Sequence, residues 1–274
     1  MNTLKTELLA TALCGFVALG ATQRANAGPN LVQNGDFSLN GGTGQIGYNT
    51  TLTDWANAPG NTSPAYNFVF APGSAADSTG AANNFGNVTS MYGPGNPNVV
   101  NGVSGNVANG FTPSPAGGTP NIVGLDSYLS PGAGAQVDAL QQTITGLTPG
   151  QTYALSFYWA SAQQVGFTGV TTNVLAVSLG GVTQDTAPQD NASEGFVPWA
   201  KVTFDYTATS SSELLSFLAE GAPPVTEPPF VLLDDVVLTQ TQTAPDATST
   251  VALFGIAATT LGIAARRFGR QCRQ

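Results

Sequence analysis

The side chains that could do chemistry in this chain are carboxylates, amides and aromatic rings. None of the 274 residues is histidine, which excludes a serine–histidine triad, a histidine–zinc site and imidazole acid–base catalysis. Two carboxylates can hydrolyse a glycosidic bond when they face each other. Adjacent Asp234 and Asp235 are predicted to point to opposite faces of a strand, and no other spacing of acidic residues indicates a pair. We therefore expect a protein that is not an enzyme.

Aromatic rings and amides can instead bind sugars, because a sugar ring has an apolar C–H face and a polar rim. The candidate stacking residues are Trp55, Tyr66 and Tyr158, and Gln163 is a candidate hydrogen-bonding partner for sugar hydroxyls. The alternative is that most of these rings belong to the core, because large aromatic side chains dominate sandwich interiors.

Short strands joined by loops must position these side chains. Only 8% of the residues are charged, and the chain has 33 Gly and 18 Pro, a composition typical of strands and turns. In 152–162, Tyr153, Phe157 and Trp159 share one face and Tyr158 lies on the other. Further strands are predicted at 66–70, 137–144, 174–179 (with a Gly180-Gly181 hairpin to 182–185), 196–206, 214–218 and 230–238. The sequence thus predicts an all-β antiparallel sandwich over residues 28–240.

Residues 71–121 differ from the rest of this domain. About half of them are Gly, Pro or Asn, and Asp77 is their only charged residue. So little apolar surface does not offset the entropy lost in ordering a regular core. We therefore predict long surface loops here, with anchors at Phe85, Met91, Tyr92 and Phe111.

Residues 1–27 have the pattern of a secretory signal. Lys5 precedes an apolar run, and a small-x-small pattern ending at Ala27 predicts cleavage after that residue. The alternative, a buried N-terminal helix, is disfavoured because Gly15 and Gly20 interrupt it.

The other end of the chain carries a second apolar segment. Arg266, Arg267 and Arg270 follow it, and clustered arginines mark the cytoplasmic side of a membrane span. A buried core helix is the alternative, but such a helix should show a polar face, and this one has none. The predicted parts are a linker at 241–250, a membrane helix at 251–267 and a basic cytoplasmic end at 268–274.

The domain between these ends is strongly acidic. Lys201 is the only basic residue between positions 28 and 244, where all but two of the 16 acidic residues lie. Such a domain repels nucleic acid, whereas a neutral glycan, a cationic partner or a metal ion is compatible with it. Both cysteines, Cys14 and Cys272, fall in the end segments, so the domain contains no disulfide.

The tail resembles the PEP-CTERM sorting signal of Gram-negative bacteria. Pro245, Asp246, Ser249 and Thr250 precede the apolar run and the arginines. Asp246 replaces the usual glutamate and Ala247 the second proline, as in minor variants of the signal. The resemblance implies recognition by an exosortase-type membrane protease. It also implies anchoring by the C-terminal helix before processing, and a place at the cell surface or in the extracellular matrix afterwards.

Three motifs resemble the galactose-binding-like jelly roll of carbohydrate-binding modules, and they lie at 34–37, 142–153 and 233–236. The resemblance implies two packed antiparallel sheets, often with a structural calcium, for which Asp36 and Asp234 are the matching residues. Ser38 stands where the family more often has glutamate. The alternative is that Asp36 only shapes an Asn-Gly-Asp turn.

These features predict an exported protein of the cell surface or matrix. One function class is a module that binds glycan, such as an exopolysaccharide. The other is a structural surface or biofilm component without sugar affinity. Aromatic side chains exposed along a groove would favour the first class, and aromatic side chains that are all buried would favour the second.

Overall fold

The computed structural model describes residues 28–59, 65–70, 81–93, 96–100, 121–126, 138–223 and 229–241. All regular secondary structure in these residues is β. Among them there is no helix of the length and apolar character that a bilayer span requires. The predicted signal and its cleavage site, the sorting motif, the membrane helix and the arginines all lie outside the described residues.

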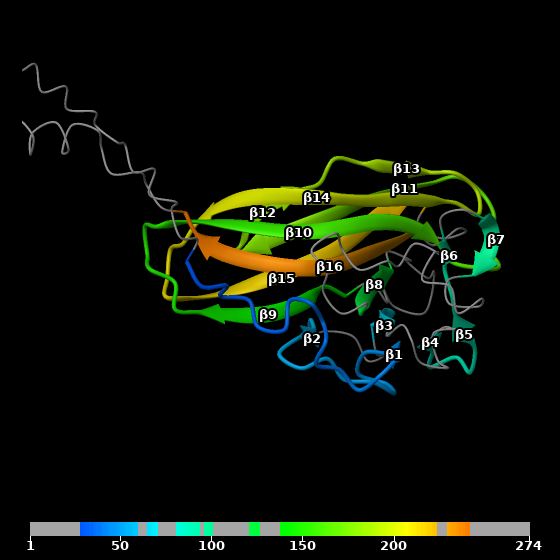
Figure 1. The fold of residues 1–274 in the computed structure, drawn as a ribbon, viewed down its shortest axis with the longest axis horizontal. Helices are drawn as coiled ribbons and strands as arrows, with labels where there is room; N and C mark the ends of the chain where they lie inside the picture. The colour runs from blue at the N-terminus through cyan, green and yellow to red at the C-terminus, as the bar shows by residue number, and fades with distance from the viewer. Residues whose placement is uncertain are drawn as a thin grey trace, which may run out of the picture. The chain divides into compact units, whose positions relative to one another are not determined.

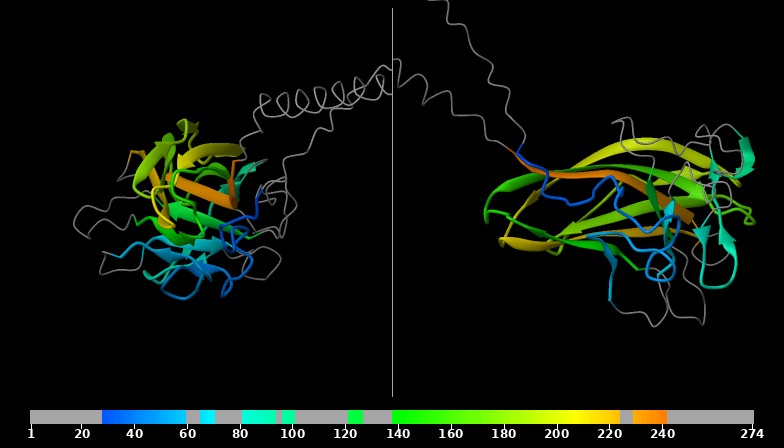
Figure 2. Two further views of the ribbon diagram at one scale, coloured as in Figure 1. Left: turned by 90° about the vertical axis from the view of Figure 1, so that its left-hand side faces the viewer. Right: turned by 60° about the horizontal axis from the view of Figure 1, so that its bottom comes forward.

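Two antiparallel sheets form the body of the fold (Figure 1). In spatial order, the β10 sheet contains β1 (Gly44–Gln45), β3 (Asn67–Phe70), β8 (Ile122–Asp126), β16 (Pro229–Gln240), β10 (Thr152–Gln163) and β14 (Phe196–Thr207). The β11 sheet contains β12 (Val182–Asp185), β11 (Thr171–Leu179), β15 (Ser212–Ala222), β9 (Leu140–Thr145) and β2 (Ala56–Asn57), with β13 (Gln189–Asn191) also paired to β11. Figure 2 shows the two sheets as stacked layers. The predicted all-β antiparallel sandwich is confirmed.

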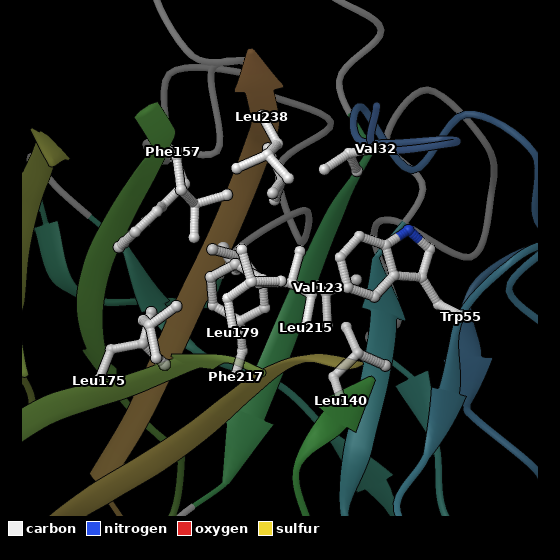
Figure 3. Close-up of a cluster of buried hydrophobic side chains, with 14 of the residues drawn as sticks. Val32, Trp55, Val123, Leu140, Phe157, Leu175, Leu179, Leu215, Phe217 and Leu238 are labelled. Atoms are coloured by element: carbon white, nitrogen blue, oxygen red, sulfur yellow. The ribbon is translucent and has the colours of Figure 1, made fainter. Parts of the chain in front are cut away.

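The main hydrophobic core lies between the two sheets. Along β10, Tyr153, Leu155, Phe157 and Trp159 are buried on the inner face, while Tyr158 is half-buried on the outer face. This alternation is the one predicted from the sequence. In Figure 3 side chains from both sheets meet in this core, Phe157 from one and Phe217 from the other, with ring centroids 5.4 Å apart.

The Gly180-Gly181 hairpin is also confirmed. Leu179 pairs with Val182, so the two glycines alone make the turn. Their φ angles are 59° and 85°, as a type I′ turn requires at both central positions. This turn matches the twist of β11 and β12, and it therefore fixes the register between them.

Residues 71–121 contain more structure than the predicted loops. Two small hairpins occur there, formed by β4 (Ala81–Ala82) with β5 (Val88–Thr89) and by β6 (Tyr92–Gly93) with β7 (Asn96–Val100). Met91 is fully buried in a second apolar cluster with Phe68, Ile122 and Phe230. This cluster supplies the burial that the composition of the segment does not suggest.

Strand β16 bulges at Asp235. The ladder with β10 passes from Ser156–Val237 to Tyr158–Asp234, and Asp235 has a φ of 49°. Leu233 and Val236 both face the core between the sheets, so neither aspartate of the pair does. The prediction that one of them points inward was wrong, because the extra residue of the bulge resets the alternation.

The first described segment, residues 28–59, packs along this bulge. Val236 N donates a hydrogen bond to Gly35 O (2.9 Å), and a Cβ atom on Gly35 would lie 2.1 Å from Val236 O. Only glycine therefore fits at this position. Leu238 N donates to Asn30 Oδ1 (2.9 Å), which ties the same segment to the last strand a second time.

The two faces of β10 predict opposite responses to truncation. We expect Trp159→Ala to lower the free energy of unfolding by about 3–5 kcal/mol, because it leaves a cavity between the sheets. Tyr158→Ala on the outer face should cost much less. Urea denaturation of both variants checks this prediction, and equal, small losses would contradict the register of β10.

Candidate functional site

A cleft of about 450 Å³ opens beside the short edge strand β2, at the margin of the β11 sheet. We call it the Asp54 cleft. Six of its ten lining residues are polar and four are apolar. They come from the first described segment, residues 28–59, which includes β2, and from β9 and β15. The lining residues are Gln33, Asp54, Trp55, Ala56, Asn57, Pro59, Gln141, Gln142, Thr143 and Leu214.

Internal hydrogen bonds fix the floor of the Asp54 cleft. Gln142 is 5% exposed, and its Nε2 donates to Gln33 O (2.8 Å) and to Asp54 O (3.2 Å). Its Oε1 accepts from Gln33 N (2.9 Å). This one amide thus holds two loops against β9, and it is a positioning group and not a free ligand group.

Trp55 forms part of the cleft wall but is itself 5% exposed. Its ring packs against Phe37 and Phe217, with centroids 5.6 and 6.0 Å away. Its Nε1 donates to Asn34 O (3.1 Å). The indole plane is therefore buried in the core, and the cleft meets only a small part of the ring.

The groups that face solvent at the rim are a carboxylate, amides and a hydroxyl. Gln33, Asp54 and Thr143 are exposed, and Gln141 makes only a long contact from its Nε2 to Ser216 Oγ (3.4 Å). Leu214 is 44% exposed and adds an apolar surface. A carboxylate accepts hydrogen bonds and an amide both accepts and donates them. The rim therefore suits an uncharged ligand with several hydroxyls and some apolar surface.

Tyr66 lies outside this cleft and contacts the β4–β5 hairpin. Its ring belongs to the outer apolar cluster, and its hydroxyl is 2.8 Å from Thr89 Oγ1 and accepts from Asn83 Nδ2 (2.8 Å). Burial is the main cause of a raised pKa for Tyr66. These contacts give Tyr66 a role in holding the hairpin.

Tyr158 and Gln163 both belong to β10 and do not line the cleft. Lys201 Nζ sits 5.6 Å from the centroid of the Tyr158 ring, on the outer face of the β10 sheet. Gln163 is fully buried, donates to Gly169 O (3.1 Å) and accepts from Glu194 N. Of the four sugar-binding residues predicted from the sequence, only Trp55 lines the Asp54 cleft.

Sequence reasoning missed Asp54, Gln141 and Gln142. The signals available were the acid directly before Trp55 and the pair of adjacent amides on one predicted strand. Neither signal could show that these segments meet, because the contact depends on how residues 28–59 pack onto β9.

The predicted metal residues lie where the first segment meets the β16 bulge. Asp36 Oδ1 accepts from Ser38 N (3.3 Å) and Ser38 Oγ (3.0 Å), so it shapes a turn. Asp234 is buried, and its Oδ1 accepts from Asp235 N (2.8 Å). Within the described ranges, no cluster of three or more acidic, histidine or cysteine side chains is arranged to hold a metal ion.

Asp235, which the sequence did not single out as a ligand, lies beside Asp36. Burial, followed by the negative charge of Asp36, raises the pKa of Asp235, while Lys201 acts in the opposite direction. Asp235 Oδ2 is buried without a hydrogen-bond partner. A cation would compensate this oxygen, but backbone carbonyls would have to supply most of a shell of six to eight oxygens.

Comparison with known proteins gives structural neighbours only. No protein-family model and no curated protein matches this chain. The xylan-binding CBM22 domain from Paenibacillus barcinonensis is 12% identical, with 80% of this chain and 98% of that domain covered and a TM-score of 0.34.

Two further neighbours are matched over shorter regions. The C-terminal domain of EclA, a sugar-binding protein, is 19% identical over 36% of this chain and 64% of its own length, with a TM-score of 0.26. A CBM4 structure is 21% identical over 38% of this chain and 61% of its own, with a TM-score of 0.23. The neighbours are thus β-sandwich domains of the carbohydrate-binding-module type. At these TM-scores the assignment of the fold rests on the sheet topology itself.

Proposed function

We propose that this protein is a non-catalytic glycan-binding domain with a galactose-binding-like jelly-roll fold, and that the glycan occupies the Asp54 cleft. The observation that carries the proposal is the convergence of Asp54, Gln141 and Leu214 on a floor fixed by internal hydrogen bonds. The volume of the Asp54 cleft, about 450 Å³, falls in the range of small-ligand sites. A fixed floor lowers the ordering cost of binding.

The chemistry of the rim favours a neutral sugar. Among the described residues, Asp54 is the only charged one that lines the cleft, so an anionic sugar would meet repulsion there and no compensating base. Neighbouring hydroxyls of a neutral sugar can donate to the carboxylate, and such charge-assisted hydrogen bonds are the stronger ones. A single lining carboxylate also lacks the partner that glycoside hydrolysis normally needs.

A structural surface component without sugar affinity is the second candidate function. The burial of Trp55 and Tyr66 favours it, because these rings offer little area for stacking. The two candidates differ in one respect that is directly measurable, which is sugar affinity at the Asp54 cleft.

The variants Asp54→Ala and Gln141→Ala test the proposed site. We expect each to weaken the binding of a neutral oligosaccharide by about tenfold or more, the effect of losing a hydrogen bond worth about 1.5 kcal/mol. A glycan array selects the oligosaccharide, and isothermal titration calorimetry measures the change. Glu220→Ala, which removes an exposed carboxylate outside the cleft, is the matched control. Unchanged affinity in both cleft variants would refute the site.

We also propose that a calcium ion is held near Asp36 and Asp235, with Asp234 next to them. The bound ion would be a positively charged partner for the buried Asp235 Oδ2, which has no hydrogen-bond partner. The residues themselves would hold the first segment against the β16 bulge.

Calcium removal tests this second proposal. We expect a chelator to lower the melting temperature by several degrees, since about 1 kcal/mol shifts the melting temperature of a domain of this size by roughly 2–4 °C. Asp235→Asn should abolish the response to chelator, whereas Asp185→Asn, an exposed control, should retain it. An identical melting temperature with and without chelator would rule out the ion.

We further propose that the protein is exported, and that its tail is processed by an exosortase-type protease. The support is the order of Pro245 and Asp246, the apolar run, and the arginines at its end. A membrane-embedded protease must find its motif at a fixed height above the bilayer, and the arginines would hold the motif there.

Two tail variants separate anchoring from cleavage. Replacing Arg266, Arg267 and Arg270 with glutamine should weaken membrane retention and release full-length chain. Replacing Pro245 and Asp246 with alanine should leave the chain membrane-bound and uncut. Mass spectrometry of surface-released protein provides the measurement, and an intact C-terminal peptide 251–274 in that material would show that the tail is not processed.

A further inference from the structure

We infer that the sugar-binding surface continues from the Asp54 cleft past Asn57 to Tyr48, and that its ligand is a chain of several sugar units and not a single unit. This inference rests on the proposed function and names the ligand class for the same site.

A second hollow of about 310 Å³ lies around Tyr48. The Tyr48 side chain is 54% exposed, so much of its ring is open to solvent. The other residues that line this Tyr48 hollow are Gly41, Gly47, Asn49, Thr50 and Thr51. The ring is thus surrounded by small and polar groups, as a platform for a sugar ring should be.

Asn57 lines the Asp54 cleft and lies beside Gly47, which lines the Tyr48 hollow. Its side chain lines the Asp54 cleft, and its Nδ2 donates to Ile46 O (2.9 Å). A Cβ atom placed on Gly47, in the Tyr48 hollow, would lie 3.7 Å from the same Nδ2. Asn57 Oδ1 accepts from Asn67 Nδ2 (2.9 Å), so its side chain is held at both ends of the amide. A ligand that extended from one hollow to the other would therefore pass Asn57.

The turn that carries Tyr48 is braced on both sides. Gln45 is fully buried, donates from Nε2 to Ala65 O (2.9 Å) and accepts from Asn84 N (2.8 Å). Asn49 accepts from Gln45 N (2.8 Å) and donates to Ala82 O (3.1 Å). The exposure of Tyr48 is therefore not a consequence of a loosely held loop, and stacking on it requires little further ordering of the backbone.

The pattern across the two hollows fits a sugar chain. A glycan presents polar hydroxyl edges and apolar ring faces along its length. The polar groups of Asp54 and Gln141 suit the hydroxyl edges, and the exposed ring of Tyr48 suits an apolar face. The fixed Asn57 amide lies between them. A single sugar unit at the Asp54 cleft would leave Tyr48 without a contact. A longer chain would use both hollows.

Binding as a function of chain length tests this inference. The probes are oligomers of one to six units from neutral β-1,4-glucan, xylan and mannan, measured by isothermal titration calorimetry. We expect affinity to rise by about tenfold or more once the chain is long enough to reach Tyr48, the effect of an aromatic contact of about 1.5 kcal/mol. Tyr48→Ala should remove this rise and leave the affinity for the shortest binding oligomer unchanged.

Three controls make the result specific. Tyr48→Phe keeps the ring and should keep the rise with chain length, which excludes a role for the hydroxyl alone. Phe85→Ala removes a ring that is equally exposed (56%) but lies outside both hollows, and it should change neither affinity. Asp54→Ala should weaken binding at every length.

The outcomes distinguish failure of the extended site from failure of the proposed function. Affinity that does not depend on length, or a length dependence that survives Tyr48→Ala, would overturn the extended site while leaving the Asp54 cleft intact. An Asp54→Ala variant that binds every oligomer like the unaltered protein would instead overturn the proposed function, as would the absence of binding by all of the oligomers.

Discussion

The packing of the first described segment on the bulge of β16 is the constraint on which the rest of the site depends. Val236 donates to Gly35 O at 2.9 Å, and a side chain on Gly35 would collide with Val236 O. The neighbouring residues of this segment then form the hydrogen bonds that fix Trp55 and Gln142. The floor of the Asp54 cleft is therefore built on a backbone contact between the two ends of the domain.

The site divides its polar groups between structure and recognition. Gln142 and Asn57 are used in internal hydrogen bonds and give the cleft its shape, while Asp54 and Gln141 are left to face the proposed ligand. The aromatic groups divide in the same way, since Trp55 and Tyr66 are buried and Tyr48 is exposed. Rigid side chains that cannot bind thus hold in place the few that can, as a preorganised site requires.

Local patterns predicted the elements of the fold but not the site. The alternation along β10 and the Gly180-Gly181 hairpin depend on period and turn chemistry, which short stretches of sequence contain. The bulge at Asp235 depends on a contact with Gly35, some 200 residues away in the chain, and Gln163 is buried because Gly169 and Glu194 close over it. Contacts between separate segments decide which polar groups remain free. Of the sugar-binding residues predicted from the sequence, only Trp55 therefore lines the cleft.

The central claim is that a neutral glycan binds at the Asp54 cleft. An NMR titration of the isotope-labelled protein with a neutral oligosaccharide tests it most directly, because the side-chain amides of the chain report on several surfaces at once. The account predicts that the Gln141 amide and the backbone amides of Asp54 and Tyr48 shift with added sugar, while the buried Gln163 amide does not. Shifts confined to the Tyr158 and Lys201 face of the β10 sheet, or no shifts at all, would contradict it.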